Sequence, residues 1–395
     1  MLKYLKANPI LVVSIAQLFG TSLWFSANSA AFDLIREWKI SISGIGFLTN
    51  AVQMGFILGT FLIAFIGIAD RYKASLIFAC SAVFGAIFNL CFAWLSQNIY
   101  EALFFRFLVG ISLAGIYPIG MKLIIEWAPQ KASLALSQLV AMLTLGTALP
   151  YALNGISTEL PWRNIISISS ILAFIASILV YFLGDGKQEK RDHKQPSNRS
   201  QSHISAFQIP NFKAAAVGYF GHMWELYTFW TLVPLLIVQT KINDSFTYFN
   251  VSFLTFTVIS VGALGCIFGG VLSRYIQSKT IALASLALSG LCCFLFVLSW
   301  KIIPAWGLII ILIIWGVTVI ADSPQFSALS AQACPPEKLG SALAIQNSIG
   351  YFLTVISIGI TTLAFDKFGV DSIWIILIGP FLGFWGYINY CKVDH

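Results

Sequence analysis

Charged side chains are scarce in this chain. Only 10% of its 395 residues are Asp, Glu, Lys or Arg, whereas 58% are hydrophobic. The sequence has no Gly-x-x-x-x-Gly-Lys-Ser/Thr phosphate loop, so we do not expect ATP to drive it directly. It also has no cluster of His, Cys and carboxylate residues that would predict a metal centre or nucleophilic catalysis. We therefore expect neither an enzyme nor a bound metal or cofactor.

Apolar runs fill nearly the whole chain, and the mean hydropathy is +0.84. A helix needs about 20 mostly apolar residues to cross a bilayer. The strands of a membrane barrel would alternate polar and apolar residues, and this chain does not. The sequence predicts an all-α polytopic membrane protein with twelve transmembrane helices. Their expected ranges are 10–31, 44–67, 75–95, 100–122, 133–157, 163–184, 212–238, 247–272, 280–300, 304–326, 338–364 and 371–391.

The landmarks of residues 110–129 recur 206 residues later, in residues 316–335. The matched positions are Gly110 with Gly316, Pro118 with Pro324, and Ala128-Pro129 with Cys334-Pro335. Two further matches, at offsets of 203 and 201 residues, pair 70–72 with 273–275 and 19–20 with 220–221. These repeats predict two pseudo-symmetric six-helix bundles, typical of a transporter with a path between its halves.

The predicted bundles are residues 1–184 and 212–395, and residues 185–211 join them as a basic linker that is too polar to pack a core. With the N-terminus inside, the inner loops and ends carry 16 Lys and Arg residues and the outer loops carry six. The positive-inside rule then places both termini and the linker in the cytoplasm. We expect the protein to lie in a bacterial inner membrane, in contact with the lipid bilayer, and to function as a monomer. We expect no nucleic-acid partner, because the net charge of +7 is spread over loops.

Two ionisable residues lie in the seventh expected span, where His222 and Glu225 are three residues apart on one helical face. A charge at bilayer depth costs at least about 2.5–3.5 kcal/mol, so such residues indicate function. Histidine titrates near neutral pH, and burial disfavours the ionised form of a carboxylate. Together they predict a proton site, flanked by Trp224 and Tyr227. The alternative is a structural hydrogen-bonded pair.

A polar stripe marks the first expected span, where Gln17, Thr21, Trp24 and Asn28 follow helical spacing. The 201-residue offset aligns Thr21 with His222 and Trp24 with Glu225. Equivalent depth on symmetry-related helices is where a midplane site forms. The stripe predicts a cavity wall that binds by hydrogen bonds and aromatic contacts. Ordinary helix packing is the alternative.

The fourth and tenth expected spans also carry charges. Arg106 lies about two turns into the fourth span, on the same face as Tyr117, and a buried guanidinium calls for an anionic partner. That partner is a substrate carboxylate, Glu225 or another protein group. Asp322 lies beside Pro324, which can kink its helix. We expect Asp322 to be either a second protonation or gate residue, or an interfacial carboxylate.

The chain has twelve expected spans in two halves, Asp70-Arg71-Tyr72 between spans 2 and 3, and Arg106-x-x-x-Gly110 in span 4. With these features it resembles the major facilitator superfamily of secondary transporters over essentially its whole length. The family pattern Gly-x-x-x-Asp-Arg-x-Gly-Arg-Arg is only partly kept in Gly67-Ile-Ala-Asp70-Arg71-Tyr72-Lys73. The resemblance implies that spans 1, 4, 7 and 10 line a central cavity. It also implies an inner-side latch of Asp70 and Arg71, with Lys73 and Arg274 in the matching loops; solvated loop charges are the alternative.

The resemblance implies a secondary active transporter that moves a small polar or anionic organic solute by alternating access. Proton-coupled uptake is the expected mode, because only Pro150 remains of the family's antiporter signature in span 5. An exporter, antiporter or facilitator of the same fold and a non-transporting membrane sensor are the alternatives. The sequence leaves the substrate open, because fold does not determine substrate.

Overall fold

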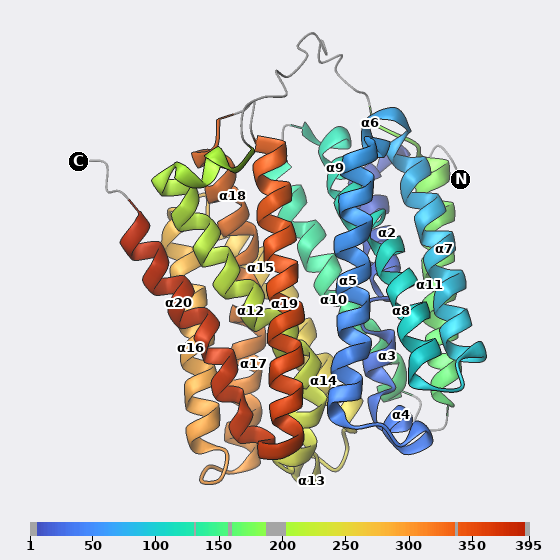
Figure 1. Cartoon of the computed structure of the whole chain (residues 1–395), viewed down its shortest axis with the longest axis vertical. Coiled ribbons are helices and arrows are strands. Elements are labelled where there is room, and N and C mark those ends of the chain that lie inside the picture. The colour runs from blue at the N-terminus through green and yellow to red at the C-terminus, as the bar shows by residue number, and fades with distance from the viewer. Residues whose placement is uncertain (1–5, 130–131, 157–159, 187–202, 336–338, 392–395) are drawn as a thin grey trace.

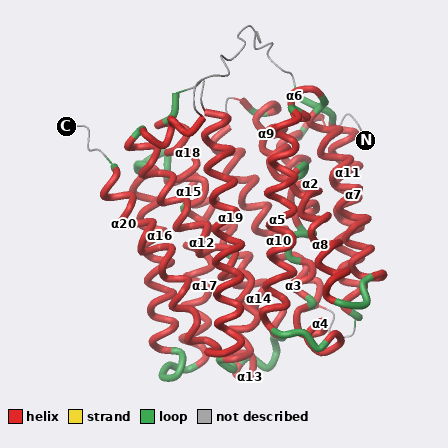
Figure 2. Tube along the Cα trace, viewed as in Figure 1, coloured by secondary structure: helices red, strands yellow, loops and turns green. Residues whose placement is uncertain are grey.

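Long helices run side by side through the whole molecule (Figure 1). This computed structural model describes residues 6–129, 132–156, 160–186, 203–335 and 339–391. Within these ranges the chain is helices and connecting loops, without strands (Figure 2). Nine helical segments there are long and apolar enough to cross a membrane, and the longest of them, the 49 residues of Ala342–Tyr390, holds two successive spans. The chain is therefore a multi-pass integral membrane protein.

Each half of the chain supplies six spans, several of which consist of two helices. The first half forms α2 (Pro9–Thr21), α3 (Ser26–Ser29), α4 (Ala31–Trp38), α5 (Ile42–Ile66), α6 (Ile68–Arg71), α7 (Ala74–Leu95), α8 (Ile99–Ala114), α9 (Tyr117–Trp127), α10 (Ala132–Ile156) and α11 (Trp162–Leu183). The second half forms α12 (Pro210–Gln239), α13 (Ile242–Ser245), α14 (Val251–Ser260), α15 (Gly262–Leu272), α16 (Ser278–Ser299), α17 (Ala305–Ala321), α18 (Ser323–Ala333), α19 (Leu339–Phe368) and α20 (Trp374–Tyr390). Two short 3₁₀ helices, His203–Gln208 and Gly369–Ile373, precede α12 and α20.

The helices confirm the predicted fold class, but several expected spans are broken. The first is interrupted by turns at residues 22–25, between α2 and α3, and the eighth at Val261. The fourth and tenth break where Pro118 and Pro324 fall in the first turns of α9 and α18. Proline lacks a backbone N–H and is favoured in the first turn of a helix, where that N–H would have no partner within the helix. The matched prolines thus explain why both halves break this span at the same depth.

Matched glycines explain how these spans pack. A Cβ atom on Gly110 of α8 would clash with the carbonyl oxygen of Val52 on α5. A Cβ atom on Gly316 of α17 would clash with the carbonyl oxygen of Val258 on α14. Both members of the second pair lie 206 residues after those of the first (52 to 258, 110 to 316). The repeat seen in the sequence is therefore one helix contact made twice, with two backbones too close for any side chain.

Gly110→Ala is expected to destabilise the protein by about 1–3 kcal/mol, because overpacking at a backbone contact forces the helices apart. Gly307→Ala is the matched control, since its added Cβ would meet only the flexible end of Ile303 at 3.3 Å. There the lost flexibility of glycine predicts a change near zero or a gain of about 0.5–1 kcal/mol. Thermal unfolding in detergent measures both variants. Equal melting temperatures would show that the α5–α8 contact tolerates a methyl group.

The two halves meet along α5 with α19, and along α10 with α14 and α15. We call the face where α11 ends and α12 begins the linker face, at the top of Figure 1, and the face with α4 and α13 the hairpin face. Near the hairpin face, hydrogen bonds join the halves. The Asp366 carboxylate of α19 accepts the backbone N–H of Ile42 at 3.0 Å and of Ser43 at 3.1 Å, and so caps α5.

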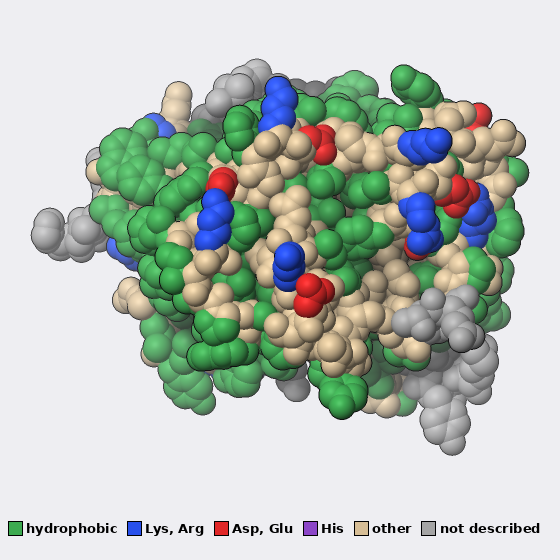
Figure 3. Space-filling model, turned by 90° about the horizontal axis from the view of Figure 1, so that it is seen from below, with side chains coloured by type: hydrophobic (Ala, Val, Ile, Leu, Met, Phe, Trp, Pro, Cys, Tyr) green, Lys and Arg blue, Asp and Glu red, His purple; other side chains and the backbone are tan. Residues whose placement is uncertain are grey.

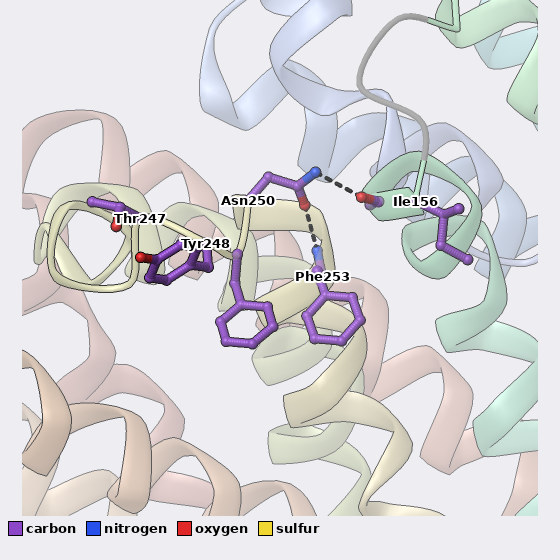
Figure 4. A pocket seen from close by; sticks show the side chains of 7 residues that line it. Ile156, Thr247, Tyr248, Asn250 and Phe253 are labelled. Carbon is purple, nitrogen blue, oxygen red and sulfur yellow. Dashed lines mark hydrogen bonds between the residues drawn. The ribbon is translucent and has the colours of Figure 1, made fainter.

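A further hydrogen bond joins the two halves on this face. The Asn250 side chain caps α14 by accepting from Phe253 N at 2.8 Å, and its amide donates to the carbonyl oxygen of Gly155 at 2.9 Å. Figure 4 shows Asn250 between the two backbones, beside a surface pocket lined by Tyr248 and Ile156. These contacts hold the halves together at the hairpin face, each through a helix end.

Charged side chains are spread over the hairpin face, with Lys or Arg often beside Asp or Glu (Figure 3). Arg163 binds Glu37 with a shortest N–O distance of 2.6 Å, and the Trp162 indole donates to the same carboxylate at 2.8 Å. The hydrogen bond from Arg163 holds the pKa of Glu37 below its usual value. This pair joins α4 to α11 within the first half, and a surface ion pair of this kind contributes little to stability.

Candidate functional site

Glu225 is buried among three helices of the second half. Its side chain, on α12, is inaccessible to solvent. One carboxylate oxygen accepts from the indole N–H of Trp315 on α17 at 2.7 Å, and the other from the hydroxyl of Ser289 on α16 at 2.8 Å. Both donors are neutral, so the cage satisfies a carboxylate without neutralising its charge. Sequence reasoning missed both donors, because Ser and Trp are common in apolar spans.

His222 lies one turn earlier on α12 and meets a different residue. Its Nδ1 is 2.8 Å from Oδ1 of Asp322, and both side chains are fully buried. Apart from this contact, neither ring nitrogen has a hydrogen-bond partner among the described residues. Asp322 stands at the break between α17 and α18. This buried acid–base pair is close enough to share a proton, yet both partners keep unused polar atoms.

The sequence grouped His222 with Glu225, whereas the structure gives each its own partners. The helix they share is enclosed by neighbours, so two residues three apart face different helices. Asp322, expected to be either a second protonation or gate residue or an interfacial carboxylate, is in the protein interior beside His222. Trp224 turns away from both, since its indole donates to the Ile375 carbonyl oxygen on α20 at 2.9 Å.

Arg106 is the buried cation of the first half. Its Nη2 donates to the carbonyl oxygens of Leu23 at 3.0 Å and Trp24 at 2.6 Å, in the break between α2 and α3. Its Nη1 donates to the Ser26 hydroxyl at 3.1 Å and to Asn89 Oδ1 at 2.9 Å. The guanidinium is fully buried. It thereby satisfies carbonyl groups that the broken helix leaves unpaired.

The expected anionic partner of Arg106 is not among the described protein groups. No described carboxylate lies within 4.0 Å of its guanidinium, and Glu225 is held by other donors. Its Nε has no hydrogen-bond partner in the described part of the chain. Arg106 therefore carries a buried positive charge that is solvated by neutral oxygens and by the face of the Phe92 ring, whose centroid lies 5.5 Å from Cζ.

An aromatic cluster, here called the aromatic junction, joins the halves at the centre of the molecule. Its members are Trp24, Phe25, Phe56, Tyr227, Trp230 and Tyr351. Trp24 stacks on Tyr227 with ring centroids 5.6 Å apart and an interplanar angle of 27°. Phe56 and Tyr351 are 4.4 Å apart, and the Tyr227 and Tyr351 hydroxyls are 3.1 Å apart. All six side chains are buried.

The polar stripe predicted for span 1 is divided by the break in that span. Thr21 donates to the Gln17 carbonyl oxygen at 2.8 Å, within its own helix. Asn28 donates to Thr49 on α5 at 2.8 Å. Trp24 stacks on Tyr227 of the second half, and Tyr117 of α9 packs edge-on to Trp24 with ring centroids 6.5 Å apart. Of the expected site residues, Tyr117 and Tyr227 both pack on Trp24.

The residues of the expected latch lie at the linker face. Arg71, Lys73 and Arg274 are exposed and make no ion pair with a side chain that the structure describes. The side chain of Asp70 is outside the described residues. Within the described ranges, no group of three His, Cys, Asp or Glu residues could hold a metal ion.

The chain forms two bundles of membrane helices. Each bundle buries ionisable groups, and an aromatic cluster lies between the two. This arrangement is typical of polytopic transport proteins. The sequence model of the Major Facilitator Superfamily matches residues 11–358. The chain belongs to this family, as the resemblance predicted.

Known relatives are distant and are transporters, not enzymes. The chain is 25% identical over 154 residues to the 4-hydroxybenzoate transporter PcaK of Pseudomonas aeruginosa, an alignment that covers 38% of this chain and 33% of PcaK. It is 27% identical over 96 residues to the niacin transporter NiaP of Acinetobacter baylyi, covering 24% and 21%. It is 21% identical over 288 residues to the probable galactarate/D-glucarate transporter GarP of Escherichia coli, covering 64% and 63%. The chain thus matches less than two thirds of the length of each of these relatives.

One solved structure shares the fold over almost the whole chain. It is the inward-facing, unoccupied form of a bacterial homologue of the human lysosomal transporter Spinster, with a TM-score of 0.74, 14% identity and coverage of 99% of both chains. At this identity the likeness establishes the fold alone.

Proposed function

We propose that this protein is a secondary active transporter that takes up a small organic anion together with a proton, by alternating access. The observation that carries the proposal is a pair of matching buried charges. Arg106, on span 4, is held by spans 1 and 3, and Glu225, on span 7, is held by spans 9 and 10, so the two sites use corresponding sets of spans. Neither has a counter-ion among the described residues. Such charges cost free energy in a membrane and are kept for function.

The two charges suit the two cargoes. Arg106 supplies a positive field that favours an anion. Glu225 and the His222–Asp322 pair offer sites for a proton, since each can be neutral or charged. When a proton enters with the anion, the complex gains no net charge, which lowers the cost of moving it across the membrane. The distant relatives named for 4-hydroxybenzoate, niacin and galactarate/D-glucarate support an organic acid as substrate.

The topology is part of the proposal. The linker face would lie in the cytoplasm with both termini, in a bacterial inner membrane, as the positive-inside rule indicates. Residues 1–184 and 212–395 would move as two bodies connected by residues 185–211, with the monomer as the functional unit. In the state open to the outside, Asp70, Arg71, Lys73 and Arg274 would form the cytoplasmic latch. The exposure of Arg71, Lys73 and Arg274 here fits a state in which the opposite face is held shut.

Asp366→Asn is expected to favour opening at the hairpin face by about five- to thirtyfold. An amide has one acceptor oxygen for two backbone donors, and it loses the charge that favours a helix N-terminus. Spin labels at Arg36 and Tyr248, exposed in opposite halves, would report a longer distance. Asp371→Asn is the control, because Asp371 binds Trp300 and Lys301 within its own half. An unchanged distance distribution would mean that the Asp366 cap does not hold this face closed.

Proteoliposomes test the proposed function. With the interior more alkaline than the exterior, labelled organic acids from a metabolite panel should accumulate inside, and a protonophore should abolish accumulation. Accumulation driven by the opposite gradient would identify an exporter or antiporter, and equilibration that ignores the gradient a facilitator. Binding without any flux would identify a sensor. Each of these three results contradicts proton-coupled uptake.

A further inference from the structure

The aromatic junction contains unpaired polar atoms. The indole N–H groups of Trp24 and Trp230 are fully buried and have no hydrogen-bond partner among the described residues. Both rings pack on Tyr227, with centroids 5.6 and 5.5 Å away. The Gln53 amide, one turn from Phe56 on α5, is likewise buried and unpaired within the described part of the chain. Buried indole and amide groups normally find partners, so these donors suit a ligand's acceptors.

The junction also lies where the halves must part. Trp24 and Phe56 belong to the first half, and Tyr227 and Tyr351 to the second. Separation of the halves at either face draws the stacked rings of Trp24 and Tyr227 apart. A flat ring can then take the place of one stacking partner, because offset-stacked and edge-on contacts tolerate centroid separations of about 4.5–7 Å.

The charge near the junction selects for an anion. Arg106 Nη2 donates to the backbone carbonyl oxygen of Trp24, so the guanidinium lies against the backbone of the residue whose ring belongs to the junction. The hydrogen bonds of Glu225 go to Ser289 and Trp315 of the second half, which are not members of the junction. An aromatic cage without a nearby positive charge would suit an organic cation, but Arg106 opposes one.

We infer that the aromatic junction is the substrate site and that the substrate is a small aromatic carboxylate. Its ring stacks among Trp24, Phe56, Tyr227 and Tyr351, and its carboxylate accepts from the free indole and amide N–H groups under the field of Arg106. This inference rests on the proposed function, since it names the anion that is transported.

Four probes of similar size test the inference by competition against labelled benzoate counterflow in proteoliposomes, and by the shift each produces in the melting temperature. Benzoate should exchange and stabilise the protein. Cyclohexanecarboxylate, which lacks the flat ring, should compete more weakly. Benzamide, which lacks the charge, and benzylamine, which reverses it, should compete least. Equal competition by cyclohexanecarboxylate overturns the aromatic part of the inference, and equal competition by benzamide or benzylamine overturns the anionic part.

Phe56→Leu locates the site. It should reduce the preference for benzoate over cyclohexanecarboxylate by about two- to tenfold, the worth of one aromatic contact. Phe78→Leu removes another fully buried ring, outside the junction, and should keep the preference. Melting temperatures confirm that both variants fold. An unchanged preference in Phe56→Leu overturns the location. If benzoate fails but an aliphatic acid accumulates, the substrate class is wrong and the proposed function stands; if no organic acid is moved at all, the proposed function itself fails.

Discussion

Proteoliposomes that contain the Glu225→Gln variant are expected to lose proton-driven accumulation while they still exchange substrate. A pH difference of one unit is worth about 1.4 kcal/mol, so symport of one proton with one anion sustains about tenfold accumulation without a membrane potential. Glutamine cannot be ionised, and we expect it to bring the final inside-to-outside ratio to about one. Its shape keeps the cage, because Trp315 can donate to the amide oxygen and Ser289 can accept from the amide nitrogen.

Two further variants are needed to interpret that result. Glu101→Gln makes the same change at an exposed carboxylate that accepts from Gln97 N, and it should leave accumulation tenfold. Asp322→Asn removes the proton site next to His222. If Glu225→Gln retains tenfold accumulation and Asp322→Asn loses it, the coupled proton binds the His222–Asp322 pair and not Glu225. If both retain it, neither site carries the proton, and the proposed coupling through α12 is wrong.

The fold was predictable because it depends on features that are local in sequence. Apolar length places the spans, and the repeated Gly110 and Gly316 mark a helix contact made in both halves. Pro118 and Pro324 signal the breaks in spans 4 and 10. The break at residues 22–25 carries no proline or glycine. It is stabilised from outside, by the Arg106 guanidinium on the carbonyl oxygens of Leu23 and Trp24. Because the stabilising residue is distant in the sequence, the residues at the break do not themselves indicate it.

The site was only partly predictable, for the same physical reason. Membrane-depth ionisable residues stand out, so Arg106, His222, Glu225 and Asp322 are visible in the sequence. Their partners depend on which helices surround each residue. Helix α12 contacts α14, α17, α18, α19 and α20, so neighbouring positions on it meet different chemistry. Periodicity therefore grouped His222 with Glu225, whereas packing pairs His222 with Asp322.

Arg106→Gln is expected to weaken both the fold and anion binding, whereas Arg106→Lys should weaken mainly the fold. Either change leaves carbonyl oxygens at the break after α2 without a full set of donors, at about 1–3 kcal/mol for each unsatisfied group. A lysine ammonium cannot reproduce the planar fork that serves four acceptors. It keeps the charge, however. At an effective dielectric constant of about 20 and a separation of about 8 Å, that charge is worth about 2 kcal/mol to an anion, or roughly thirtyfold in Kd.

The two variants separate the two roles because they share one loss and differ in the other. Thermal unfolding should show lower melting temperatures for both than for the wild type. Ligand-induced melting shifts with an organic acid should then persist in Arg106→Lys and decline in Arg106→Gln. If both variants bind the anion as well as the wild type does, Arg106 acts only as a brace for the broken first span. The charge of Arg106 would then not contribute to anion selectivity, and the neutral N–H donors of the junction would have to bind the anion.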